Sequence, residues 1–211
     1  MVLPVVAYGD PVLKKVGEEI SSDYPNLQEL IANMFETMYA SRGVGLAAHQ
    51  IGIPIRLFIV DCSSFKEDEP DLADFKKTFI NAEIIEEEGE EWLFSEGCLS
   101  IPEVREDVSR KPKITIRYCD ENFVEHTDTF DGFAARVIQH EFDHTEGVLF
   151  VDYLSMLRKT MIKRKLSDIV NGKISPEYRM RFYKQKKGRR QNKKKTKQGL
   201  RAGGGGGGGG G

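Results

Sequence analysis

The sequence predicts an α+β domain, because helical and strand patterns occupy separate stretches of the chain instead of alternating. An apolar stripe at spacings of three and four indicates a helix over roughly Asn26–Ala40. Several strand-like segments follow, and then two more helices are expected, over Ala134–His144 and from Val151 to about Val170. Regular βαβ units would interleave these patterns. With 211 residues, 39% of them hydrophobic, the chain can bury one sizeable core.

The helix ends carry boundary signals. Asp10 and Pro11 are typical of a helix start, with an acidic N-cap and a proline in the first turn. Leu27, Leu30, Ile31, Met34, Phe35 and Met38 form the stripe of the first long helix, and the glycines at 43 and 45 break its pattern. Gly147 is a plausible stop for the helix that begins near Ala134.

The strands are expected in the middle of the chain. Residues 57–60 form a short apolar run, and 78–87 are also strand-like. Apolar residues alternate with polar ones at 114–118 and again at 123–130, with Asp120-Glu121-Asn122 between them as a hairpin turn. The polar, acidic stretch 63–74 is expected to be a surface loop.

Charge divides the chain into an acidic body and a basic tail. Residues 1–157 contain 31 acidic and 13 basic residues, a net charge of −18, whereas residues 158–211 contain 2 and 18, a net charge of +16. We therefore predict a folded acidic body over 1–157, a helical basic extension over 158–183 and a disordered basic tail over 184–211. The glycine run 203–211 is a linker or an appended segment and carries no fold information.

Composition also excludes some classes of protein. No run of about 18 apolar residues is present, so no membrane-spanning helix is expected. The N-terminus lacks the basic and apolar regions of a signal peptide. Three cysteines, an odd number, argue against a disulfide framework and for a reducing, cytoplasmic compartment.

The strongest local motif is His140-Glu141-Phe142-Asp143-His144. Histidines at i and i+4 lie on one face of a helix and can reach one metal ion, while Glu141 can take a proton from a metal-bound water. The pattern is also compatible with two surface histidines on an ordinary helix. A catalytic metal needs a third protein ligand and one open position.

Several residues compete for the third ligand position. The longer metalloprotease pattern places a histidine where this chain has Phe150. The downstream carboxylates lie in no second motif; they are Glu146, Asp152, Asp168 and Glu177. Cys98 is a better candidate, because it follows a glycine and a metal-bound thiolate suits Fe(II), Zn or Co. Cys62 and Cys119 are expected to be structural.

A third segment runs from Gly43 to Gln50 and is weak on its own. Its small residues allow close substrate approach, and the Gln50 amide N–H can stabilise an oxyanion. A glycine turn before a short helix explains the segment equally well. His49 is expected to be structural or exposed.

Together, three segments resemble the signature motifs of the peptide deformylase family of the bacterial type. They are Gly43-Val44-Gly45-Leu46-Ala47-Ala48-His49-Gln50, Glu96-Gly97-Cys98-Leu99-Ser100 and Gln139 to His144, and they occur in the family's order. The resemblance covers residues 1–157. It implies mostly antiparallel strands packed around a central metal-binding helix, with a C-terminal helix.

The resemblance also implies an activity and its residues. The enzyme would remove the N-formyl group from nascent chains that begin with formyl-methionine, releasing formate. Cys98, His140 and His144 would bind one divalent metal, Fe(II) in the cell, with Zn, Ni or Co as substitutes. Glu141 would be the general base on metal-bound water, and Gln50 and the Leu99 N–H would stabilise the oxyanion.

Further residues are assigned by the same resemblance. The substrate methionine would lie in a pocket walled by Val44, Phe133 and Val137, with Gly45 bonding the peptide backbone. Arg105 would pair with Glu96 and brace the cysteine loop. The chain departs from the usual pattern at Thr145, where leucine is common, and at Arg136, where an apolar residue is common. The acidic loop 67–74 is longer than in compact members.

The basic tail suggests a partner. A strongly cationic segment is attracted to RNA phosphates, and Tyr178, Phe182 and Tyr183 are interleaved with arginines. We expect residues 158–201 to dock the enzyme near the ribosomal exit tunnel. Two other functions fit less well: a zinc endopeptidase needs a third His or Glu ligand, and a catalytically silent RNA-binding protein would have lost a ligand or the base.

Overall fold

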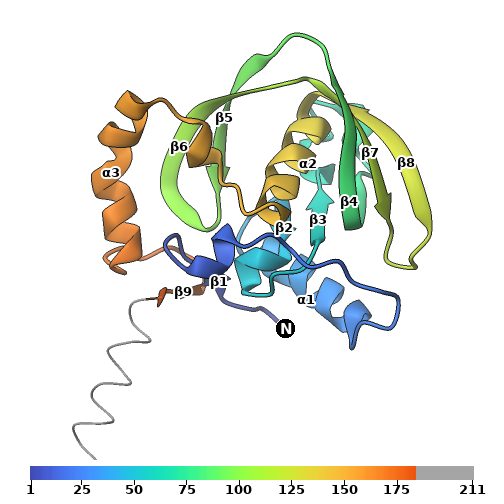
Figure 1. Cartoon of the computed structure of the whole chain (residues 1–211), viewed down its shortest axis with the longest axis horizontal. Helices are drawn as coiled ribbons and strands as arrows, with labels where there is room; N and C mark the ends of the chain where they lie inside the picture. Colours follow the sequence, from blue (N-terminus) through green and yellow to red (C-terminus); the bar gives the residue numbers. More distant parts are fainter. Residues whose placement is uncertain (184–211) are drawn as a thin grey trace, which may run out of the picture.

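The computed structural model describes residues 1–183, and it has a helix at its centre (Figure 1). Helix α2 (Gly132–Thr145) lies between a five-stranded antiparallel sheet and a β-hairpin. The sheet has the order β2 (Gly45–Ala47), β3 (Leu57–Asp61), β4 (Lys76–Glu88), β7 (Lys113–Cys119) and β8 (Glu125–Asp131). The hairpin consists of β5 (Trp92–Cys98) and β6 (Ile101–Arg110). This arrangement confirms the predicted fold.

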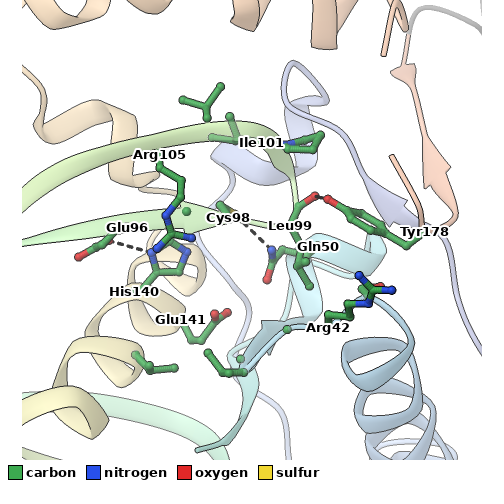
Figure 2. Close-up of a pocket in the computed structure, with 18 of the residues that line it drawn as sticks. Arg42, Gln50, Glu96, Cys98, Leu99, Ile101, Arg105, His140, Glu141 and Tyr178 are labelled. Carbon is green, nitrogen blue, oxygen red and sulfur yellow. Dashed lines mark hydrogen bonds and ion pairs between the residues drawn. The ribbon is translucent and has the colours of Figure 1, made fainter. Parts of the chain in front are cut away.

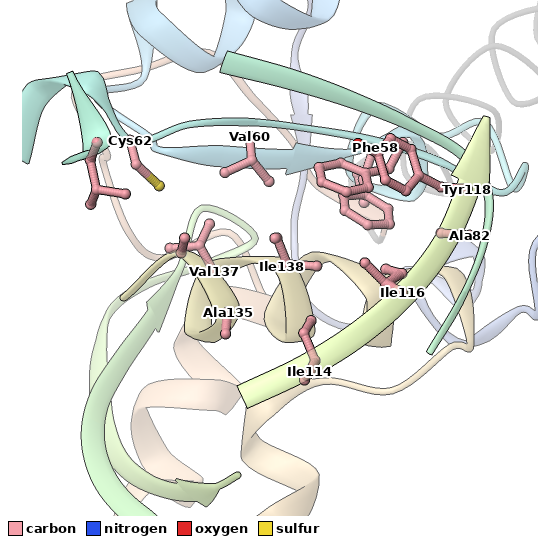
Figure 3. Close-up of a cluster of buried hydrophobic side chains, with 14 residues drawn as sticks. Phe58, Val60, Cys62, Ala82, Ile114, Ile116, Tyr118, Ala135, Val137 and Ile138 are labelled. Carbon is pink, nitrogen blue, oxygen red and sulfur yellow. The ribbon is translucent and has the colours of Figure 1, made fainter. Parts of the chain in front are cut away.

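Strand β3 is buried on both faces, which explains its unbroken apolar sequence. Phe58 and Val60 point into a cluster with α2, whereas Leu57 and Ile59 pack toward α1 (Leu27–Ala40). Figure 3 shows the first cluster, in which Ile138 of α2 lies among side chains from the sheet. The sheet therefore holds α2 firmly on one side.

The predicted helix boundaries agree closely with the structure. The Asp10 carboxylate accepts a hydrogen bond of 3.0 Å from the Val12 N–H and caps a short 3-10 helix (Pro11–Lys14). Gly147 has a φ of 72°, and a Cβ there would lie 2.7 Å from the Lys14 carbonyl oxygen. Only glycine suits that position, and it stops α2, whose last residue is Thr145. The loop over 63–74 contains two further 3-10 helices, Ser63–Phe65 and Pro70–Leu72.

The C-terminal part of the body differs from the prediction. A 3-10 helix (Phe150–Tyr153) comes first, and helix α3 (Met156–Val170) then begins after the Ser155 cap and packs outside β6. The predicted helical extension over 158–183 is wrong beyond Val170, because Gly172 adopts a φ of 66° and the chain turns back. It ends in β9 (Met180–Arg181), which pairs in parallel with β1 (Val5–Val6).

The segments that contain β1 and β9 thus belong to the body. Ile162 and Ile169 of α3 are buried with Val104 and Val108 of β6, and Phe182 packs against the same cluster. A boundary at residue 157 would cut through α3. The predicted disordered tail, 184–211, lies outside the described residues. Within residues 1–183, no helix has the length and apolar content needed to cross a bilayer.

Candidate metal centre

Cys98, His140 and His144 converge at the centre of the molecule, as the sequence predicts. Their ligand atoms all lie within 4.8 Å of one another, and the Cys98 Sγ is 3.4 Å from the His144 Nε2. The histidines occupy successive turns of α2, which brings their ring centroids to 5.3 Å. Cys98 ends β5, where a tight turn at Leu99–Ser100 reverses the hairpin. Both histidines are buried and the cysteine is half-buried.

Gln50 reaches this centre from the opposite side, as Figure 2 shows. Its Oε1 accepts a hydrogen bond of 2.9 Å from the Ala47 N–H, which fixes the orientation of the amide. The Nε2 then faces the cysteine turn, where it donates to the Cys98 Sγ and the Ser100 Oγ, both at 3.4 Å. The amide N–H is therefore directed at the space beside the three ligand atoms.

Glu141 is almost completely buried, with 4% of its surface exposed. Burial raises the pKa of this carboxyl to about 7, and its Oε2 has no hydrogen-bond partner among the described residues. The carboxylate packs against Gly45, where an added Cβ would lie 2.5 Å from the Glu141 Oε1. Glycine at position 45 is thus required by the position of the acid.

Glu96 holds His140 through a buried network of charges. Its carboxylate accepts hydrogen bonds from the Arg110 Nε at 2.7 Å and the Arg136 Nη1 at 3.0 Å, and it lies 2.9 Å from the His140 Nδ1. Arg110 also donates to Asp143 at 2.7 Å. Burial acts to raise the pKa of Glu96, but His140 and Arg110 outweigh it and lower the pKa to about 2. Two acids, Glu96 and Asp143, thus face two guanidiniums in this buried network.

The predicted pairing of Arg105 with Glu96 is wrong. Arg105 donates to the Ser95 carbonyl oxygen at 2.7 Å instead. The reason lies in the hairpin: Cys98 pairs with Ile101, but the next pair is Gly97 with Arg105, so β6 contains three extra residues. An odd insertion reverses which side chains share a face, and it places Arg110 with Glu96. Glu103, in the inserted stretch, has a φ of 64°.

The donor set fits a divalent metal ion. One thiolate and two imidazoles can supply three ligands and leave a fourth position open, as catalytic metals require. Burial lowers the pKa of His144 well below its ordinary value, so this ring is neutral. In His140, burial is outweighed by Cys98 and Glu96, which raise its pKa, so a bound metal would displace a proton there. A carboxylate on the far nitrogen of a ligand histidine is a common support.

Three of the four downstream carboxylates are engaged elsewhere. Phe150 is buried and stacks on the His140 ring, with centroids 6.0 Å apart. Glu146 forms an ion pair with Arg56, Asp152 with Lys14, and Glu177 with Arg42. These partners favour Cys98 as the third ligand.

A groove of about 890 Å³ opens next to the three ligands. Val44, Gly45, Phe133 and Val137, the predicted substrate-binding residues, all line it. Phe65 and Phe94 extend the aromatic wall, with ring centroids 4.4 and 5.8 Å from that of Phe133. The groove is therefore apolar beside α2 and polar at the metal ligands.

Arg136 also borders the groove. It stands where an apolar residue is common in the family, and its burial explains how a cation fits there. Only 2% of the residue is exposed, its guanidinium stacks on Trp92 at 4.6 Å, and it donates to Glu96 and the Val108 carbonyl oxygen. The guanidinium is thus engaged in the Glu96 network.

Sequence reasoning missed several residues of the site. Arg110, Asp143 and Tyr153 belong to the Glu96 network, and Tyr178 donates to the Leu99 carbonyl oxygen at 2.6 Å. Asp143 was the signal available in the sequence: it lies inside the histidine motif, and a buried acid there requires a cation as its partner. Tyr178 was interpreted as a surface aromatic of a nucleic-acid segment, yet it lines the groove.

The residues expected to be structural are mostly buried. His49 is fully buried, not exposed, and its Nε2 lies 3.0 Å from the Lys15 carbonyl oxygen. Burial lowers its pKa to about 4. Cys62 is buried in the sheet cluster, and Cys119 is half-buried at the end of β7.

Comparisons with known proteins identify the family. The family model described as polypeptide deformylase matches residues 2–160. A peptide deformylase of Flavobacterium johnsoniae is 61% identical and one of Christiangramia forsetii is 60% identical, each over 90% of this chain and 100% of the relative. A crystal structure of a peptide deformylase from Legionella pneumophila, 37% identical, superposes with a TM-score of 0.72 over 80% of this chain and 95% of that one.

Proposed function

The chain belongs to the polypeptide deformylase family, and we propose that it hydrolyses the N-formyl group of the initiator formyl-methionine of nascent polypeptides, releasing formate. The observation that carries this proposal is the meeting of three distant segments. Gln50, Cys98 and the pair His140–Glu141 come from a 3-10 helix (Ala48–Ile51), a hairpin and an α-helix, and they surround one position at the end of an apolar groove.

The metal would be held by Cys98, His140 and His144. We propose Fe(II) in the cell, with Zn, Ni or Co able to substitute, because a thiolate with two imidazoles suits these borderline ions. When bound, the metal would polarise the formyl carbonyl and acidify a water molecule. Glu96 would keep the His140 ring turned so that its Nε2 faces the metal position.

Glu141 would act as the general base. A carboxyl with a pKa near 7 can accept a proton from the attacking water and return it to the amine that leaves. Its unpartnered Oε2 is the atom available for that proton. The Gly45 backbone packs against the carboxylate and restricts its movement.

Two N–H groups would stabilise the oxyanion that develops on the formyl oxygen. The Gln50 Nε2 is already directed at the ligand cluster by the Ala47 N–H. The Leu99 N–H follows Cys98 directly in the turn. Donors fixed in advance need no reorganisation in the transition state, and loss of one oxyanion donor from a hydrolase can cost about 10²–10³ in rate.

The substrate would lie along the groove. The methionine side chain would pack between Val44, Phe133 and Val137, and the Gly45 backbone would bond the peptide. Arg105 also lines the groove, and we propose that it braces β5 through the Ser95 carbonyl oxygen.

We also propose that the basic tail docks the enzyme on the ribosome, in the cytoplasm where formylated chains emerge. The +16 charge of residues 158–211 supports this, and Arg158, Lys163, Arg164 and Lys165 are exposed on α3. The aromatic residues no longer support it, since Tyr178 and Phe182 pack in the body. Pelleting with ribosomes at rising salt tests the idea, and equal pelleting by the full chain and by residues 1–183 would refute a role for the tail.

The catalytic proposal is tested with Glu141→Gln, which keeps the size of the side chain and removes the base. The variant should retain one metal per chain by elemental analysis and lose deformylation of a formyl-Met peptide by about 10²–10⁴-fold. Unchanged turnover with metal retained would exclude Glu141 as the base.

A further inference from the structure

The turn that carries Cys98 is held from outside by an N-terminal segment and by the last segment of the described residues. The Tyr8 N–H donates to the Ser100 carbonyl oxygen at 2.8 Å, and the Tyr178 hydroxyl donates to the Leu99 carbonyl oxygen at 2.6 Å. Leu99 and Ser100 are the two residues of the turn. Figure 2 shows the Tyr178 hydroxyl against Leu99, across the turn from Gln50.

The two tyrosines are placed by one small element. Val5 pairs with Met180 and Val6 with Arg181 in the parallel strands β1 and β9, so Tyr8 and Tyr178 flank the same two-stranded sheet. Met180 and Phe182 anchor this sheet in the core beside Val6. The backbone that carries Tyr178 is therefore held in place next to the turn.

We propose that Tyr178 is a positioning residue for the reaction: its hydroxyl fixes the Leu99–Ser100 peptide unit and thereby steadies the adjoining Cys98–Leu99 unit, whose N–H would face the developing oxyanion. This inference rests on the function proposed above for the same site. The Tyr8 N–H fixes the next unit, Ser100–Ile101, and Cys98 pairs with Ile101 across the turn. The Cys98–Leu99 unit lies between these fixed points, so its rotation is restricted.

The neighbouring residue strengthens this assignment. Glu177 forms an ion pair of 2.9 Å with Arg42, which follows α1 on the other wall of the groove. Residues 175–178 therefore join the cysteine turn to the opposite wall, and all four line the groove. Both charged side chains are largely exposed, so this ion pair adds little stability and mainly locates the segment. Tyr178 carries the stronger constraint.

Two further observations agree. Burial raises the pKa of the Tyr178 hydroxyl, so it stays protonated and remains a donor at neutral pH. The family model ends at residue 160, so the segment that carries Tyr178 lies beyond the part of the chain shared with the family model. The chain thus adds a support for the turn from its own C-terminal segment.

The test compares Tyr178→Phe with Tyr118→Phe in the full-length, Co(II)-loaded protein. Both substitutions delete one tyrosine hydroxyl, but Tyr118 donates to Asp128 at 2.8 Å within the β7–β8 pair. Three quantities are measured: kcat and KM on a formyl-Met peptide, the cobalt–thiolate absorption band, and hydrogen exchange of the amides in residues 97–101.

We expect Tyr178→Phe to lower kcat about 5- to 50-fold with KM within about twofold, because one oxyanion donor is displaced but not lost. Exchange at residues 97–101 should accelerate and the cobalt–thiolate band should shift. Tyr118→Phe should leave all three unchanged. A wild-type kcat and wild-type exchange in Tyr178→Phe would overturn the inference, as would an equal loss of kcat in both variants.

The two proposals fail separately. If the wild-type protein does not release formate, the proposed function is wrong, whereas exchange and the cobalt band still decide whether Tyr178 fixes the turn. If the wild type is active and Tyr178→Phe is indistinguishable from it, only the positioning role is lost.

Discussion

Glu96→Gln perturbs the buried network that supports His140, and it is expected to cost both stability and metal affinity. The substitution keeps the shape of the side chain but removes a charge that faces Arg110 and Arg136. Glu96 is 4% exposed, so water cannot replace the lost charge. Only Asp143 would then remain to balance two buried guanidiniums.

The expected magnitude follows from that imbalance. Removing one partner of a buried ion pair costs about 3–5 kcal/mol in the free energy of unfolding. The weaker hydrogen bond between position 96 and the His140 Nδ1 should lower metal affinity by about 10–100-fold. Glu83→Gln is a matched control, because it breaks an exposed ion pair with Arg117 and should cost less than about 1 kcal/mol.

A second substitution tests the explanation by charge. Arg136→Met removes one guanidinium, so the double variant Glu96→Gln/Arg136→Met again has one buried acid and one buried cation. We expect its loss of stability to be smaller than the sum of the two single losses by about 1–3 kcal/mol. Urea unfolding of the four proteins measures this, and strictly additive losses would refute the reasoning.

Three other perturbations have defined outcomes. Gly45→Ala should lower kcat by about 10²-fold in steady-state assays, because the new Cβ would lie 2.5 Å from the Glu141 Oε1 and displace the base; a normal kcat would contradict this. Cys98→Ser should reduce metal retained after dialysis by about 100-fold, whereas Cys119→Ser should retain it fully; equal retention would remove Cys98 from the ligand set. Phe150→Ala should lower the free energy of unfolding by about 3–5 kcal/mol in urea, since the ring is 1% exposed and supports His140; a loss below about 1 kcal/mol would show that the site does not depend on it.

The features that the sequence could predict are those set by local pattern. Helix α2 has both its histidines on one face because their spacing is a property of the helix, and its end follows from Gly147. The double burial of β3 follows from its unbroken apolar run. Cys98 could be assigned as a metal ligand only from the combination of three motifs, because a single cysteine carries no information about its partners.

The features that escaped prediction depend on pairings between distant residues. The prediction that Arg105 pairs with Glu96 is wrong because three extra residues in β6 shift the strand register. No local pattern in the sequence marks that shift. The pairing of β1 with β9 joins segments about 175 residues apart through only two residues each. Tyr178 therefore gave no sequence signal of its place in the groove, and its basic neighbours pointed toward RNA instead.

The most direct test of the account is formate release by the anaerobically prepared, Fe(II)-loaded full-length protein. A formyl-Met peptide and its acetyl-Met counterpart are supplied in parallel, with Glu141→Gln as the matched inactive protein. The account predicts rapid, stoichiometric formate and a new free amine from the formylated peptide alone, and only by the wild type. No formate from the wild type, or equal release by Glu141→Gln with its metal bound, would contradict it.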